Sequence, residues 1–73
     1  MEEFKIRIYT KKELALMYFP QSSPRTAVNH LMAWINLCTP LLSELEQTGY
    51  QKRNKAFSPK QVKAIVDYLG EPG

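Results

Sequence analysis

The sequence predicts a small α+β domain that is mainly α-helical, with four short helices and a minor two-stranded β element. Three observations support this fold class. The chain has 73 residues and a mass of 8.5 kDa, close to the smallest size that one hydrophobic core supports, so we expect a single compact domain over residues 1–73. A serine or threonine precedes each of four segments with apolar residues at helical spacing. Two further segments, residues 4–9 and 50–57, have the pattern of short strands.

The two predicted strands are expected to pair as a small sheet. In residues 4–9 apolar and polar side chains alternate, so the face of Phe4, Ile6 and Ile8 is predicted to be buried. Segment 50–57 is basic and begins and ends with aromatic residues, which is typical of a strand or a loose hairpin. Pairing places three basic residues on a protruding turn beside the helices: Lys52, Arg53 and Lys55.

Helix boundaries follow from capping signals. Residues 10–13 match a capping box, in which the threonine hydroxyl and the glutamate side chain each accept from the other's backbone N–H, so a helix is predicted from Lys11 to about Phe19, before Pro20. A hydroxyl residue followed by proline then recurs three times, at residues 23–24, 39–40 and 58–59. These pairs predict helices over residues 24–38, from 39 to a stop at Gly49, and from 58 to a stop at Gly70.

The helix predicted from Pro24 to Cys38 has two different faces on a helical wheel. One face is apolar and includes Trp34, which we expect on the core side. Its members are Ala27, Val28, Leu31, Trp34, Ile35 and Cys38. The opposite face carries small or polar residues: Arg25, Thr26, Asn29, Ala33 and Asn36. This separation distinguishes residues that pack from residues that are free to contact a partner.

Composition limits the possible classes of function. A net charge of +3 and a pI near 9.2 favour anionic partners. The single cysteine, Cys38, has no intrachain partner, and His30 has no second ligand at metal-binding spacing, so we expect no metal and no cofactor. The acidic residues are scattered, so we expect no catalytic residues, no enzyme activity and no small-molecule substrate. No stretch approaches the roughly 20 apolar residues of a membrane span, and the acidic start differs from a secretory signal, which predicts a cytoplasmic protein.

Several motifs resemble those of known families. These features occur in order along the chain: the pattern of residues 10–15, a short turn, a helix from Ser23-Pro24, and the motifs at 45–50 and 57–59. Together they resemble the winged helix-turn-helix layout of MerR-like and excisionase-like proteins. The motifs at residues 9–15, 27–35 and 57–59 are also similar to those of a small family of gut-bacterial domains of unknown function. This second resemblance covers nearly the whole chain. The first resemblance implies that helix 24–38 is a recognition helix and that 50–57 is a basic wing, whereas the second implies no activity.

In a helix-turn-helix protein, the first turns of the recognition helix contact base edges in the major groove. Arg25 could then pair with guanine and Asn29 with adenine, while the small Ala33 allows close approach, and Thr26 and Asn36 could contact phosphates. The alternative is that these residues form the ordinary solvated face of an amphipathic helix.

The basic segment offers the same choice between function and solubility. Lys52, Arg53 and Lys55 fit a wing that contacts the phosphate backbone, and Lys60 could join them. Alternatively, the charges only protect an exposed strand edge. Tyr50 and Phe57 could stack on bases, or they could belong to the core, which is the more common role of aromatics in so small a domain.

Two functional hypotheses remain open. In the first, the chain is a small DNA-binding or transcription-regulatory accessory protein that binds double-stranded DNA. In the second, it is a protein-interaction module or a homodimer, which uses the edge of strand 4–9 or the face of residues 25–36 to bind another chain.

Overall fold

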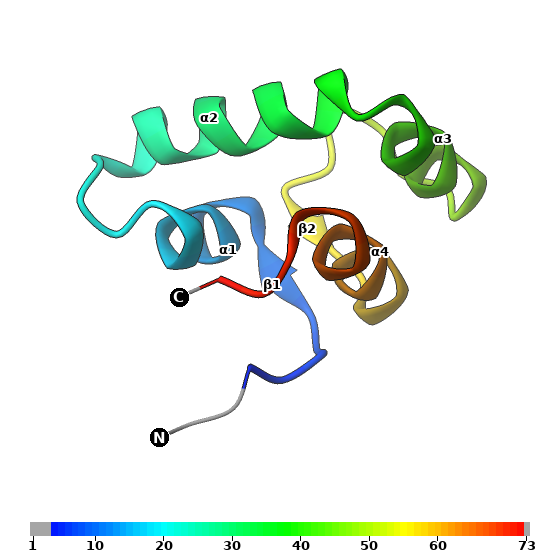
Figure 1. Ribbon diagram of the computed structural model, residues 1–73, viewed down its shortest axis with the longest axis horizontal. Helices are drawn as coiled ribbons and strands as arrows, with labels where there is room; N and C mark the ends of the chain where they lie inside the picture. The colour runs from blue at the N-terminus through cyan, green and yellow to red at the C-terminus, as the bar shows by residue number, and fades with distance from the viewer. Residues whose placement is uncertain (1–3, 73) are drawn as a thin grey trace.

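The computed structural model describes residues 4–72, which form four helices and one two-stranded antiparallel sheet (Figure 1). The elements in chain order are β1 (Tyr9–Thr10), α1 (Lys11–Tyr18), α2 (Pro24–Leu37), α3 (Thr39–Gln47), β2 (Ala56–Phe57) and α4 (Pro59–Leu69). The predicted α+β class, with four helices and a minor sheet, is therefore confirmed. Among these residues, no helix combines the length and the apolar character needed to cross a membrane.

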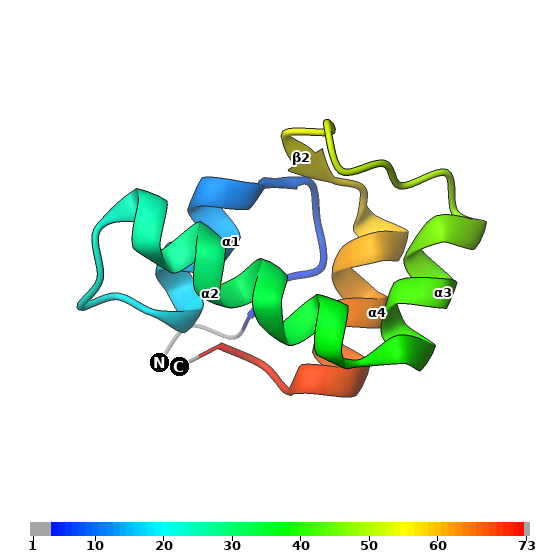
Figure 2. The ribbon, with the colours of Figure 1, turned by 90° about the horizontal axis from the view of Figure 1, so that it is seen from above.

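The longest helix, α2, lies across one side of the domain and joins two parts of it (Figure 1). It packs against α1 at one end and against α3 at the other, and α3 packs in turn against α4. From α3 the chain returns along one edge of the molecule to β2, which pairs with β1 (Figure 2). The sheet thus brings the start of α1 next to the segment that precedes α4.

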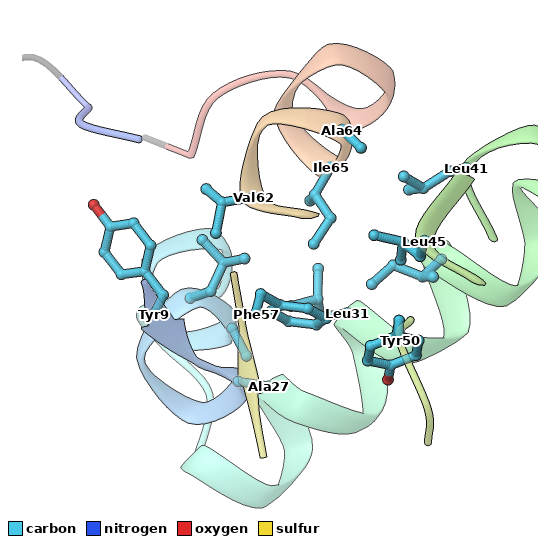
Figure 3. Close-up of a cluster of buried hydrophobic side chains, with 13 residues drawn as sticks. Tyr9, Ala27, Leu31, Leu41, Leu45, Tyr50, Phe57, Val62, Ala64 and Ile65 are labelled. Carbon is cyan, nitrogen blue, oxygen red and sulfur yellow. The ribbon is translucent and has the colours of Figure 1, made fainter. Parts of the chain in front are cut away.

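The core receives side chains from every element (Figure 3). Phe57 is fully buried, and its ring stacks on that of Tyr50 with centroids 5.6 Å apart. The other core residues are Tyr9, Leu14, Ala15, Ala27, Leu31, Ile35, Leu41, Leu45, Val62, Ala64 and Ile65. Tyr50 and Phe57 are therefore core residues, and their faces are not available as a stacking platform for bases.

The predicted caps at the starts of α1 and α4, which follow directly after β1 and β2, are confirmed. The Oγ1 atom of Thr10 accepts a hydrogen bond from the N–H of Glu13, and the Oε1 atom of Glu13 accepts one from the N–H of Thr10, both at 3.0 Å. Ser58 and Gln61 form the same reciprocal pair at α4. These bonds satisfy backbone donors that the first turn of a helix leaves without partners. The side chain of Ser23 likewise accepts from the N–H of Thr26 at the start of α2.

The predicted hydroxyl cap at Thr39 is wrong. Thr39 is the first residue of α3, and its N-cap is Cys38, which makes no side-chain capping bond. The reason is the tight connection between α2 and α3. Cys38 is the only residue between the two helices: its N–H donates to the carbonyl of Trp34, and its carbonyl accepts from the N–H of Leu42. The predicted end of α2 at Cys38 is accordingly one residue too late.

The predicted strand over residues 4–9 is largely wrong, because only Tyr9 and Thr10 pair with β2. Tyr9 lies opposite Phe57, so extension of the ladder toward the N-terminus would place Ile8 opposite Ser58, which caps α4. Because the chain enters α4 at this point, residues 4–8 have no strand with which to pair. Two of the three side chains predicted to be buried are therefore exposed, Ile8 by 61% and Ile6 by 45%, whereas Phe4 packs against the core.

Phe4, Lys5 and Arg7 instead contact Tyr9, which is buried. The ring of Phe4 stacks on the Tyr9 ring at 5.4 Å between centroids, and the guanidinium group of Arg7 lies 4.0 Å from the centroid of that ring. The hydroxyl of Tyr9 donates to the carbonyl of Lys5. The aromatic residue at the end of the segment, rather than its apolar alternation, fixes this part of the chain.

The predicted core position of Trp34 is also wrong, since its side chain is 43% exposed. It lies at the edge of the apolar stripe of α2, whose centre is formed by Ala27, Leu31 and Ile35. The indole packs edge-on against Phe19, with centroids 4.8 Å apart. Trp34 therefore covers the end of α1 from outside and does not enter the core.

Candidate nucleic-acid interface

The polar face of α2 is free. The five residues predicted to form it are all exposed: Arg25, Thr26, Asn29, Ala33 and Asn36. The buried residues Ala27, Leu31 and Ile35 hold the opposite side of the helix against the core. Apart from the exposed Trp34, the arrangement of α2 thus matches the predicted separation of an apolar face and a polar face.

One side of this face borders the segment that precedes β2. Met32 accepts a hydrogen bond at its sulfur from the Tyr50 hydroxyl, 3.7 Å away, and Val28 lines a hollow with residues of the same segment. At 100° per residue, Arg25 and Asn29 lie next to these two side chains on the helix surface. The side chains suited to base recognition therefore adjoin the basic segment.

The segment between Tyr50 and β2 is fixed at several points. Its two aromatic ends are buried in the core, and the N–H of Asn54 donates to the carbonyl of Gln51 at 2.9 Å, closing a turn. The N–H of Lys11 donates to the carbonyl of Lys55 at 2.8 Å. These contacts hold the backbone of the turn in a defined position against α1.

Lys11 makes a second link to this turn through its side chain. The Nζ atom donates to the carbonyl of Lys52 at 2.8 Å and lies 5.0 Å from the centroid of the Tyr50 ring. Partial burial lowers the pKa of the Lys11 ammonium below its ordinary value, because removal from water penalises the charged form. The carbonyl and the negative face of the ring act in the opposite direction and favour the ammonium.

A hollow of about 460 Å³ opens between the start of α1, α2 and the turn. Among the described residues, its lining includes five cationic side chains and no acidic one. The described residues that line it are Thr10, Lys11, Lys12, Val28, Lys52, Arg53, Asn54 and Lys55. We call this site the basic hollow. The structure brings together the three predicted wing residues and adds Lys11 and Lys12, which the sequence identifies only as part of a helix start.

Lys60 does not belong to the basic hollow. It lines a separate hollow of about 440 Å³ between α3 and α4, together with Lys63 and the acidic residues Glu44 and Asp67. Lys63 and Asp67 form an ion pair at 3.0 Å on this side of the domain. The mixed charge of this surface makes it less suited to a polyanion than the basic hollow.

The remaining reactive side chains are not gathered into a site. His30 is exposed, and its ring packs edge-on against Phe19 at 5.2 Å between centroids. Cys38 is half-buried between α2 and α3. Over residues 4–72 there is no group of three or more histidine, cysteine, aspartate or glutamate side chains placed to hold a metal ion.

The model of one protein family matches residues 5–72, nearly the full length of the chain. The chain belongs to the family described as "Domain of unknown function (DUF4248)". This match confirms the resemblance to a family of domains of unknown function. No curated protein and no solved structure is significantly similar to the chain. Membership in the DUF4248 family carries no activity, so a functional assignment depends on the site itself.

Proposed function

We propose that this protein is a small DNA-binding accessory protein of transcription regulation that binds duplex DNA through α2 and the turn before β2. The observation that carries the proposal is the basic hollow, which over residues 4–72 is lined by five cationic residues and no acidic one, directly beside the exposed polar face of α2. A concentrated positive surface next to a free helix is the footprint of a protein that binds the phosphate backbone and reads the adjacent groove.

The two parts of the surface have different tasks in this proposal. Arg25 and Asn29 lie in the first half of α2, where a recognition helix meets base edges, and they suit guanine and adenine respectively. Thr26, Ala33 and Asn36 lie around them, with Ala33 allowing close approach and the other two contacting phosphates. Lys52, Arg53 and Lys55 hold the backbone as a wing. In a bacterium such a protein works in the cytoplasm, and we include this location in the proposal.

Duplex DNA is favoured over a single strand. Binding of single strands without sequence preference relies on exposed aromatic side chains on which bases stack. The two aromatics nearest the basic turn, Tyr50 and Phe57, are 5% and 0% exposed. A basic surface without a stacking platform suits contacts to the sugar-phosphate backbone of a duplex.

Self-association is the second candidate function, and a separate observation favours it. Trp34 and Leu37, one turn apart on α2, are 43% and 83% exposed. Two large apolar side chains on one side of a helix suit contact with a second copy of the chain. The edge of the segment before Tyr9 and the face of residues 25–36 offer further contact surface. An apolar interface of this kind would respond little to salt, in contrast to DNA binding.

The test is a backbone-amide NMR titration of the protein with mixed-sequence duplex DNA, at low salt and again at about 0.2 M salt. We expect shifts in residues 25–36 and 52–55 that weaken at the higher salt. With about four phosphate contacts, the affinity should fall with a log-log slope near −3.6, at about −0.9 per contact. An unchanged spectrum at low salt would exclude DNA binding, and concentration-dependent shifts around Trp34 without DNA would support self-association.

A further inference from the structure

The basic hollow is larger than contact with single backbone phosphates requires. Its volume of about 460 Å³ lies within the range of about 300–1,000 Å³ that is typical of small-molecule sites. A wing that only touches a duplex needs exposed charges on a convex turn. A concave surface of this size also has room for a discrete small ligand.

The lining of the basic hollow combines two kinds of surface. Lys12, Arg53 and Lys55 supply exposed positive charges, while the half-buried Val28 contributes an apolar patch from α2. The half-buried Asn54 adds a side-chain amide that can donate and accept hydrogen bonds. Charged groups beside an apolar patch and an amide match a ligand that has both anionic and flat, partly apolar parts.

Two hydrogen bonds hold the backbone on two sides of the hollow in place before any ligand binds. The backbone N–H of Lys11 bonds to the carbonyl of Lys55, and its Nζ atom bonds to the carbonyl of Lys52, each at 2.8 Å. These two bonds set the separation between α1 and the turn. An ammonium group has three donors, so Lys11 retains donors for a ligand after its bond to Lys52. A site whose backbone is held in place binds with a smaller loss of conformational entropy.

Within residues 4–72, no cationic residue that lines the hollow forms an ion pair. In the part of the chain that the structure describes, the ion pair is Lys63 with Asp67, on α4, and the hollow itself has no acidic lining. Positive charges held close together repel one another, and a ligand with several negative charges relieves that repulsion.

We propose that the basic hollow binds a nucleotide-sized phosphorylated small molecule, with its phosphate groups on the lysine and arginine side chains and its base against Val28 and Asn54. This inference goes beyond the proposed function, because binding of such a ligand does not require DNA. Where DNA also binds, the two compete for Lys52, Arg53 and Lys55, so the small ligand would release the protein from DNA. The competition, unlike the binding itself, rests on the proposed function.

The experiment is an amide NMR titration of the full chain with three probes in metal-free buffer: ATP, tripolyphosphate and adenosine. We expect ATP to shift residues 10–12, 28 and 52–55 and to bind more tightly than tripolyphosphate, which lacks the base. Adenosine alone should bind weakly, because it lacks the charges. Arg53→Gln should weaken ATP binding about tenfold, as expected for loss of one charge-assisted contact.

Lys60→Gln is the matched control, since it removes the same charge from the surface between α3 and α4. Equal weakening by both variants would show that net charge alone attracts ATP and would overturn the proposal. Equal affinity for ATP and tripolyphosphate would overturn the role of the base. If duplex DNA shifts the spectrum and ATP does not, the inference fails while the proposed function stands; if ATP binds and DNA does not, the reverse holds.

Discussion

The ammonium group of Lys11 donates a hydrogen bond to the backbone carbonyl of Lys52, 2.8 Å away, across 41 positions of the chain. We predict that Lys11→Met, which keeps an apolar stem but removes the charge, releases the turn before β2. Amide exchange of residues 51–55 should accelerate about tenfold, the equivalent of one charge-assisted bond. Lys12→Met is the control, because Lys12 is exposed beside it. Equal exchange in both variants would contradict the role of this bond.

The partial exposure of Trp34 predicts a modest stability loss on truncation. Trp34→Ala removes ring contacts with Phe19 and Tyr18, at centroid distances of 4.8 and 6.4 Å. We expect the free energy of unfolding to fall by about 1–2 kcal/mol, less than the about 3–5 kcal/mol for a fully buried aromatic residue. Phe57→Ala, at a fully buried position, is the comparison and should unfold the domain. Circular dichroism shows whether each variant is folded, and urea denaturation gives the free energy of unfolding of Trp34→Ala. An unfolded Trp34→Ala variant would contradict the prediction.

The helices could be predicted well from the sequence because their starts depend on local chemistry. Thr10 with Glu13 and Ser58 with Gln61 form bonds within four residues, so the pattern alone locates them. The strand was harder to predict because its length depends on a distant partner. Tyr9 pairs with Phe57, and the cap at Ser58 ends the ladder, which no property of residues 4–8 reveals.

Only those parts of the candidate site that depend on local sequence can be predicted. The exposed face of α2 follows from helical periodicity, and the basic turn follows from composition. The contribution of Lys11 arises only when β1 and β2 pair and bring the start of α1 beside Lys52. The exposure of Trp34 likewise depends on the position of Phe19 at the end of α1, which packs against the indole. A helical wheel gives the direction of a side chain but not how much of that side chain a neighbouring element covers.

Tyr18 predicts a loss of stability at alkaline pH. Burial, and secondarily the charge of Glu71, raise the pKa of Tyr18 from the ordinary 10.0 to about 12. The folded state therefore holds the phenolic proton more tightly than the unfolded state. The stabilisation is complete below pH 10 and is lost as the pH rises toward 12.

Tyr18→Phe isolates this effect from the other tyrosines, since the pKa values of Tyr50 and Tyr68 are also raised. At neutral pH the variant loses the hydrogen bond from the Tyr18 hydroxyl to the carbonyl of Gly70. Between pH 10 and 12 the unmodified protein should lose stability more steeply than the variant, as measured by urea denaturation at each pH. Parallel curves over this range would show that Tyr18 ionises at its ordinary pKa.

Gln61 links two helices through one buried amide and should be sensitive to truncation. Its Oε1 atom accepts from the N–H of Ser58 at 3.0 Å, its Nε2 atom donates to the hydroxyl of Thr48 at 3.1 Å, and the residue is 5% exposed. Gln61→Ala should lower the free energy of unfolding by about 1–3 kcal/mol, because the two hydrogen bonds of its buried amide are lost, each worth about 0.5–1.5 kcal/mol. Gln47→Ala makes the same chemical change at an exposed position and should lower the free energy of unfolding by less than about 0.5 kcal/mol. Thermal unfolding of both variants measures the difference. Similar losses would show that the link is not stabilising.

Arg25 and Lys55 separate base recognition from backbone contact in the proposed DNA complex. If Arg25 pairs with guanine, Arg25→Ala should cost about 1–3 kcal/mol on a preferred sequence and little on others. Lys55→Gln should weaken binding to all sequences alike and reduce the magnitude of the salt slope by about 1. Fluorescence anisotropy with labelled duplexes at several salt concentrations measures both effects. If Arg25→Ala binds every duplex as tightly as the unmodified protein, α2 does not read the groove and only the turn contacts DNA.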